Sequence, residues 1–155
     1  MSPSEINIGD VPPGFSLKDQ DGNDHSLDDY KGKKIILSFH PLAWTGLCTT
    51  QMQQLDSKFD KIAELGGVGF GLSIDSTFCK HAWCKDMGVK KTRLLSDFWP
   101  HGGYSAELGL FREVEGTAKR AVVILGADGK VAWKKVYPVS ELPDIEEIMS
   151  EFEKV

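Results

Sequence analysis

The segment IILSFHPLAWTGLCTTQM, residues 35–52, joins a strongly apolar run to a polar pattern that contains a cysteine. The run at 35–39 is short, nearly unbroken and rich in isoleucine and leucine, which is typical of a strand buried on both faces of a sheet. After Pro41, apolar residues recur at intervals of three and four up to Ile62, which predicts an amphipathic helix over 45–65. The segment therefore predicts a central strand that leads directly into a helix.

The rest of the chain adds the elements of an α/β protein to this centre. Upstream, the Asp21-Gly22 turn signal predicts an N-terminal β-hairpin. Downstream, the expected elements are a strand at 68–74, a helix ending near Gly88, a hairpin of strands at 121–125 and 131–137, and a final helix from about Ser140. Strands joined by helical crossovers and followed by a hairpin predict an α/β fold. We expect a thioredoxin-like three-layer sandwich, with a central mixed β-sheet flanked by helices.

Composition indicates one compact domain over 1–155. A hydrophobic share of 41% in 155 residues suits a single core, and no run of eighteen apolar residues or export signal occurs. The net charge of -5 argues against partnership with nucleic acid or an anionic membrane. Three cysteines are an odd count, which fits a reducing compartment with catalytic or buried thiols. We therefore expect a cytoplasmic protein.

Cys48 lies where chemistry is expected in such a fold. In α/β sheets the ligand crevice lies beyond the carboxyl ends of the strands, and residues 40–48 leave the end of the central strand. A cysteine in the first turn of a helix faces unpaired N–H groups and the positive end of the helix dipole, which favour a thiolate. Thr45 is a natural helix cap, and Pro41 can rim a pocket without offering an N–H. Taken singly, each also has a structural explanation.

Together, the spacing Pro41-x-x-x-Thr45-x-x-Cys48 resembles the active-site signature of the peroxiredoxins, thiol peroxidases with a thioredoxin fold. The resemblance implies that Cys48 attacks the peroxide, that Thr45 holds the peroxide oxygens and that Pro41 shields the thiolate from water. It also places the family's arginine at Arg120, in GTAKRAVVIL. The segments FHPLAWTGLC and LLSDFWPHGG are most similar to the alkyl hydroperoxide reductase E branch. One departure is Gln51, where many members carry a glutamate.

The segment LLSDFWPHGG also carries two aromatic residues, Phe98 and Trp99. Together with Trp44 they supply either core packing or an apolar patch for a homodimer.

Two further cysteines, Cys79 and Cys84, are candidates to resolve an oxidised Cys48. On a helical wheel, Cys79 shares an apolar face with Phe78, Ala82, Trp83 and Met87, which predicts a core position. Cys84 falls on the opposite side, near Lys80, and is expected to be exposed and mildly activated. Resemblance to the bacterioferritin-comigratory branch also favours Cys84, with Cys79 as the second choice. Because disulfide bonding requires close Cα atoms, local unwinding of the helices is expected.

The expected activity is thiol-dependent reduction of hydrogen peroxide and organic hydroperoxides, with no metal, flavin or haem. A Cys48–Cys84 disulfide would be reduced by thioredoxin, a glutaredoxin-like protein or a low-molecular-weight thiol. One alternative is a one-cysteine cycle in which an external thiol reduces the sulfenic acid. Another is a non-catalytic thioredoxin-fold binding or chaperone module. A metal site at Cys79, His81 and Cys84 is disfavoured, because one helix scatters these side chains. His40, beside Pro41, either orients a substrate or is a solvent-facing strand end, and the second interpretation is favoured. The same two alternatives are open for His101.

Overall fold

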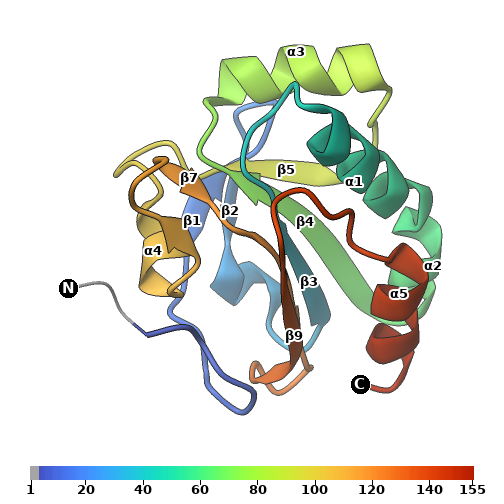
Figure 1. The fold of residues 1–155 in the computed structure, drawn as a ribbon. Coiled ribbons are helices and arrows are strands. Elements are labelled where there is room, and N and C mark those ends of the chain that lie inside the picture. Colours follow the sequence, from blue (N-terminus) through green and yellow to red (C-terminus); the bar gives the residue numbers. More distant parts are fainter. Residues whose placement is uncertain (1–3) are drawn as a thin grey trace.

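The computed structural model describes residues 4–155, so residues 1–3 of the predicted domain lie outside it. Its centre is a seven-stranded sheet (Figure 1). The strands of this sheet are β1 (Ser16–Lys18), β2 (Asp24–Ser26), β3 (Lys34–Phe39), β4 (Gly67–Ser73), β5 (Arg93–Ser96), β8 (Arg120–Leu125) and β9 (Val131–Tyr137). A separate two-stranded sheet pairs β6 (Phe111–Arg112) with β7 (Thr117–Ala118). The helices are α1 (Gly46–Ser57), α2 (Phe59–Glu64), α3 (Thr77–Met87), α4 (Gly103–Glu107) and α5 (Ile145–Glu153), with a 3₁₀ helix at Leu27–Tyr30.

The strand order β2-β1-β5-β4-β3-β8-β9 makes this a mixed sheet. Strands β3, β4 and β5 run parallel and are joined by helical crossovers, whereas β8 pairs antiparallel with β3 and with β9. The N-terminal hairpin of β1 and β2 extends the other edge through β5. The thioredoxin-like fold, the central position of β3 and both hairpins are therefore confirmed.

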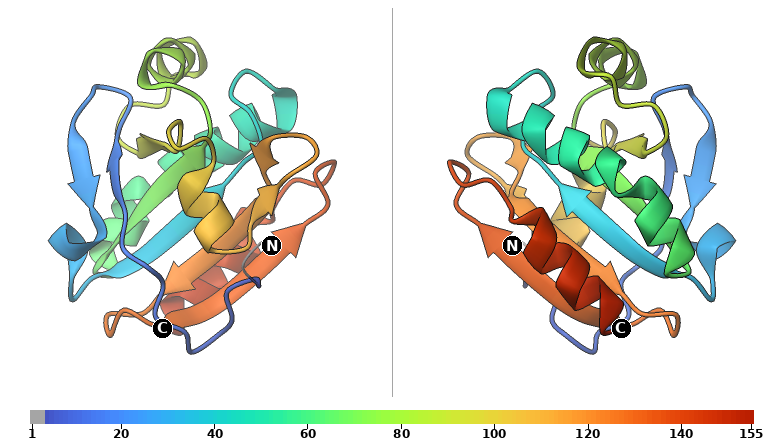
Figure 2. Two further views of the ribbon diagram at one scale, coloured as in Figure 1. Left: turned by 90° about the vertical axis from the view of Figure 1, so that its left-hand side faces the viewer. Right: turned by 90° about the vertical axis from the view of Figure 1, so that its right-hand side faces the viewer.

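Alternate residues of β3 supply two different cores, one on each face of the sheet. Ile36 packs with residues of α1, α2, α3 and α5, whereas Leu37 and Phe39 pack with residues of α4 and the N-terminal segment. This is the side-chain alternation of a strand covered on both faces. Figure 2 shows α1 and α5 in front of one face of the sheet and α4 in front of the other. Helices therefore cover both faces of β3, the strand that leads to Cys48.

Two helices begin or end where the sequence did not predict. The helix expected over 45–65 is broken at Lys58, whose ψ of 6° leaves the helical range, and it continues as α2. The last helix begins at Ile145 rather than near Ser140. Asp144 fixes this start because its carboxylate accepts hydrogen bonds from the backbone N–H groups of Glu146 and Glu147.

The buried face of α3 coincides only in part with the predicted one. The residues that it buries are Lys80, Trp83, Cys84 and Met87. Trp83 and Met87 are buried as predicted, whereas Phe78 is 86% exposed and Ala82 is exposed. The prediction was wrong for Lys80 and Cys84, because it treated Lys80 as a marker of the solvent side.

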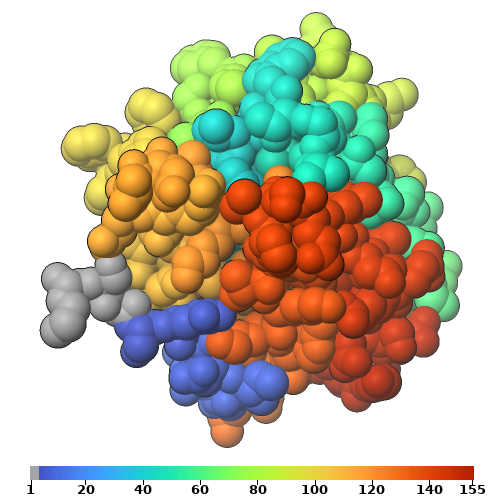
Figure 3. All heavy atoms as spheres, viewed as in Figure 1, coloured from blue at the N-terminus to red at the C-terminus, as the bar shows by residue number. Residues whose placement is uncertain are grey.

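Among residues 4–155, no helix combines the length and the apolar character needed to cross a membrane. The short elements β5, α4, β6 and β7 were not predicted from the sequence. On the face shown in Figure 3, the segment after β9 (orange-red) lies against the segment that leads into α1 (cyan). These two segments meet over the site described next.

Candidate active site

Cys48 is the third residue of α1, just beyond the carboxyl end of β3, and its side chain is fully buried. Thr45 occupies the N-cap position, as expected, but its hydroxyl does not cap the helix. Instead, Thr45 Oγ1 donates to the carbonyl oxygen of Leu42 at 2.8 Å. The first N–H groups of α1 thus lack a side-chain cap, and they lie in the helical turn that carries Cys48.

The loop before α1 is held in place from the neighbouring strand. Pro41 is buried, and the backbone N–H of Ala43 donates to Asp75 Oδ2 at 2.9 Å. Trp44 adopts a φ of 70°, a left-handed conformation that is strained for a large side chain. The loop therefore has one defined shape, which is fixed by Asp75 at the end of β4 and not by glycine.

Arg120 lies directly beside the sulfur of Cys48. It is the first residue of β8 and is only 3% exposed, and its Nη1 lies 3.4 Å from Cys48 Sγ. The rest of the guanidinium is fixed, because Nε and Nη2 both donate to the carbonyl oxygen of Val139, at 3.1 and 2.9 Å. A buried guanidinium at this distance stabilises negative charge on the sulfur. The expected proximity of Arg120 and Cys48 is present in the structure.

Gln51 organises this contact, a role that the sequence left open. Its Oε1 accepts from Arg120 Nη1 at 2.7 Å, while its Nε2 donates to Ser38 Oγ at 2.7 Å and to the carbonyl oxygen of Phe39 at 3.1 Å. The amide therefore connects Arg120 to the end of β3. Because it is neutral, it positions the guanidinium without cancelling its charge.

The two cysteines of α3 differ from the sequence expectation. Cys84 was expected to be exposed and is 5% exposed, and burial raises the pKa of its thiol to about 11. Cys79 is only partly buried, and burial together with the nearby Asp75 raises the pKa of its thiol. All three cysteines are free thiols. Neither α3 thiol is activated in this conformation, so the predicted activation of Cys84 by a lysine is wrong.

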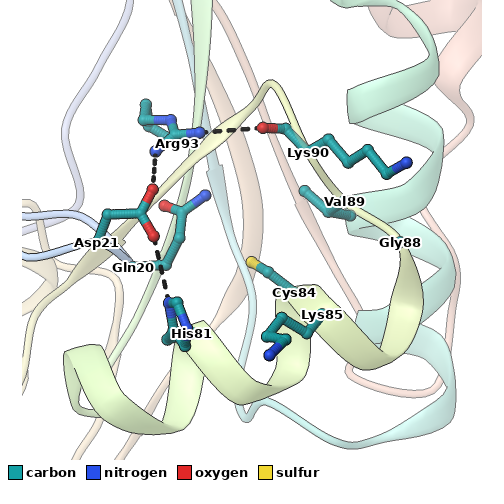
Figure 4. Close-up of a pocket in the computed structure, with 9 residues that line it drawn as sticks. All are labelled: Gln20, Asp21, His81, Cys84, Lys85, Gly88, Val89, Lys90 and Arg93. Carbon is teal, nitrogen blue, oxygen red and sulfur yellow. Dashed lines mark hydrogen bonds and ion pairs between the residues drawn. The ribbon is translucent and has the colours of Figure 1, made fainter.

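Cys84 also faces away from the Cys48 site. Figure 4 shows its sulfur turned toward a pocket of about 340 Å³, between α3 and the β1–β2 turn. The lining residues of this pocket are Gln20, Asp21, His81, Cys84, Lys85, Gly88, Val89, Lys90 and Arg93. Cys48, Gln51 and Arg120 do not line this pocket. A bond between Cys48 and Cys84 therefore requires α3 or α1 to open.

The two histidines left open by the sequence have different surroundings. His40 is fully buried rather than a solvent-facing strand end, and burial holds its pKa well below 6.5, so the ring is neutral. Exposed His101 forms a hydrogen bond through Nε2 with the carbonyl oxygen of Gly116, at 2.7 Å, which is a structural contact. Within the part of the chain that the structure describes, no three His, Cys, Asp or Glu residues are arranged to hold a metal ion.

The aromatic residues of uncertain role are exposed and do not belong to the core. Trp44, Phe98 and Trp99 are 53%, 52% and 80% exposed, so the core interpretation is wrong. Phe78 of α3, which the sequence placed in the core, joins Phe98 and Trp99 around a surface pocket of about 550 Å³. Phe78, Phe98 and Trp99 thus form an apolar surface between the start of α3 and the segment after β5.

Comparison with known proteins shows the family to which this chain belongs. A model of the AhpC/TSA family matches residues 8–134. The chain belongs to the AhpC/TSA family. Alkyl hydroperoxide reductase E of Mycobacterium tuberculosis is 31% identical over 140 residues, which cover 90% of this chain and 91% of that protein. A thiol peroxidase of Staphylococcus epidermidis is 30% identical over 158 residues, covering 100% and 93%.

The fold of this chain is also that of solved peroxiredoxin structures. A reduced 2-Cys peroxiredoxin of Plasmodium vivax superposes with a TM-score of 0.87 at 24% identity, covering 96% of this chain and 81% of the other. The prediction of a peroxiredoxin, and hence of an enzyme, is confirmed. Gln51 contacts Arg120 at the site, although the sequence assigned it no role, and its position three residues after Cys48 on the same helix was the available signal.

Proposed function

We propose that this peroxiredoxin reduces hydrogen peroxide and organic hydroperoxides through the thiolate of Cys48. The sulfur attacks one peroxide oxygen, the O–O bond breaks, and the other oxygen leaves as water or an alcohol after taking up a proton. Cys48 becomes a sulfenic acid. The observation that carries this proposal is the 3.4 Å contact between Arg120 Nη1 and Cys48 Sγ in a buried site at a helix N-terminus. One cation there stabilises both the attacking sulfur and the departing oxygen.

Pro41 and Thr45 complete the proposed site from the loop before α1. Buried Pro41 excludes water beside the thiolate and offers no competing N–H. Thr45 is exposed, and its hydroxyl, which donates to the carbonyl oxygen of Leu42, can still accept a hydrogen bond from a bound hydroperoxide. The relatives named alkyl hydroperoxide reductase and thiol peroxidase support a peroxide substrate.

For the second half of the cycle, we propose that Cys84 condenses with the Cys48 sulfenic acid to form an intramolecular disulfide. Cys84 lies on α3 and packs in the same core cluster as Cys48. Local opening of the helices is therefore sufficient to convert the reduced form into the disulfide-bonded form, without a rearrangement of the whole chain. Cys79 is the second choice. Its thiol donates to Asp75, the residue that also holds the loop before α1. If neither bonds, an external thiol reduces the sulfenic acid.

The proposed reductant is thioredoxin, a glutaredoxin-like protein or a low-molecular-weight thiol, in the cytoplasm. We propose that the whole chain, 1–155, acts as one catalytic domain. The exposed aromatic residues Trp44, Phe98 and Trp99 are the proposed contact surface of a homodimer, because apolar side chains of this size are otherwise unfavourable in water.

The test is peroxide consumption in the presence of dithiothreitol. The wild-type protein and Cys79→Ser are expected to consume peroxide catalytically, whereas Cys48→Ser is expected to be inactive although folded. A non-catalytic binding or chaperone module predicts no consumption by any of the three proteins. Equal activity of Cys48→Ser and wild type would remove Cys48 from the mechanism.

A further inference from the structure

Lys80 is buried in the middle of α3 without a partner for its charge. Its side chain is 0% exposed, and its Nζ forms no hydrogen bond with any residue of 4–155. It lies one helical turn before Cys84, on the same buried face. A buried ammonium is normally paired or hydrogen-bonded, because removing it from water is costly. An exception of this kind calls for a functional explanation.

The groups around Lys80 do not neutralise it by contact. His40 is also fully buried, its Nδ1 lies 3.4 Å from the carbonyl oxygen of Ser38, and its Nε2 has no partner among residues 4–155. Asp75 is the main opposite charge, but its carboxylate already accepts hydrogen bonds from Ala43 and Ser73 and from the Cys79 thiol. The titratable and charged groups whose fields reach Lys80 or its neighbour His40 are Asp75, Asp97, Cys48, Cys79, Cys84 and Arg120.

The consequence is that the charged form of Lys80 opposes the packing of α3. Burial, only partly opposed by Asp75, lowers the pKa of Lys80 from 10.5 to about 8. At neutral pH the lowered pKa shifts the equilibrium between packed and opened α3 toward the opened form by about 300-fold, compared with a lysine of ordinary pKa. Any opening of α3 that exposes Lys80 to water removes this destabilisation. The same opening frees Cys84, because both side chains lie on one face of α3.

We propose that Lys80 is a positioning residue of the disulfide-forming step, whose buried and unpaired ammonium weakens the packing of α3 so that Cys84 can leave the core and reach oxidised Cys48. This inference rests on the proposed function, and in particular on Cys84 as the resolving residue. Lys80 acts through the position of Cys84 and does not touch the peroxide.

The step that Lys80 promotes is balanced without another oxidant. The Cys84 sulfur attacks the sulfenic sulfur of Cys48, the S–S bond forms and the S–O bond breaks. The departing hydroxide takes the proton of the Cys84 thiol and leaves as water. Cys84 is oxidised and the sulfenic sulfur is reduced. Slow opening would leave the sulfenic acid exposed to a second peroxide, which oxidises it to sulfinic acid.

Lys80→Met tests the proposal, because methionine has a similar length and no charge. After one equivalent of peroxide, disulfide formation measured by rapid quench and mass spectrometry is expected to slow at least about tenfold, given the 300-fold factor above. Excess peroxide should produce more sulfinic acid at Cys48. The thermal midpoint of unfolding should rise, because an unpaired buried charge is removed. Lys85→Met is the matched control: Lys85 is exposed on the same helix, beside Cys84 in Figure 4, and its loss should change none of these results.

Hydrogen exchange in the wild-type protein gives a second test that needs no foldable variant. A lysine whose pKa is lowered in the packed state destabilises packing most below pH 8, and that effect disappears as pH rises from about 8 to 10.5. The opening equilibrium of α3, corrected for intrinsic exchange, should therefore decrease between pH 7 and pH 9.5. An opening equilibrium that stays level or increases over this range in the wild-type protein would overturn the role of Lys80.

The outcomes separate this inference from the proposed function. If Cys48 forms no sulfenic acid in the wild type, the proposed function fails. If Cys48 is oxidised but Lys80→Met forms the disulfide at the wild-type rate, only the role of Lys80 is overturned. An oxidised Cys48 that never bonds to Cys84 also overturns it, whereas the peroxidase activity of Cys48 stands.

Discussion

Arg120 and Gln51 are joined by a hydrogen bond of 2.7 Å between Nη1 and Oε1, and the same nitrogen lies 3.4 Å from the sulfur of Cys48. One side of the guanidinium thus faces α1, and the other is fixed by the carbonyl oxygen of Val139. The positive charge is held in one place before any substrate arrives. Preorganised charge of this kind is the main source of rate acceleration in many enzymes.

Replacing Arg120 with methionine should therefore slow the reaction with peroxide by about a hundredfold, the loss typical for one preorganised charge donor. Alkylation of Cys48 at neutral pH should slow as well, because the positive charge 3.4 Å from its sulfur is lost. Arg120→Lys should recover only part of both rates, since an ammonium cannot reproduce the fork that bonds Val139 and Gln51. Stopped-flow measurement of peroxide reduction checks this. Wild-type rates in Arg120→Met would remove Arg120 from the site.

Gln51→Leu should loosen the guanidinium without removing it. The substitution deletes the acceptor for Arg120 and leaves Ser38 Oγ without its donor, so we expect a loss of about 1–3 kcal/mol in the free energy of unfolding. The rate with peroxide should fall, but less than in Arg120→Met. Gln54→Leu, on the same helix and outside the site, is the control. Equal effects of the two leucine variants would contradict the role given to Gln51.

The left-handed backbone of Trp44 provides a test of the loop before α1. Because its φ is 70°, Trp44→Gly should be more stable than Trp44→Ala by about 1 kcal/mol, since only glycine adopts this conformation without strain. Both variants lose the same indole, so the comparison isolates the backbone. Denaturant unfolding of the pair gives the difference. Equal stability would mean that the loop relaxes to another conformation.

Cys84 should react slowly with iodoacetamide in the reduced protein at pH 7. Burial raises the pKa of its thiol to about 11, so only about one molecule in ten thousand carries the thiolate. Labelling should accelerate as pH rises toward that value, and peptide mapping by mass spectrometry follows each cysteine separately. Rapid labelling of Cys84 at pH 7 would show that α3 is already open.

The sequence predicted the strands and helices better than the side-chain contacts between them. The apolar run at 35–39 and the Asp128-Gly129 turn are local signals, and they gave the central strand and the hairpin correctly. The contact of Arg120 with Gln51 joins residues 69 positions apart, so no local pattern could reveal it. The buried face of α3 was predicted only in part, because its helical wheel has apolar residues on both sides. Only tertiary packing decides that Lys80 is buried and Phe78 exposed.

The most direct test of the account is the reaction of Cys79→Ser/Cys84→Ser, a variant that retains only Cys48, with one equivalent of peroxide. The account predicts that the peroxide is consumed stoichiometrically and that Cys48 gains one oxygen as a sulfenic acid, which dimedone traps. Peroxide left unconsumed by the folded variant, with Cys48 still a thiol, would contradict it.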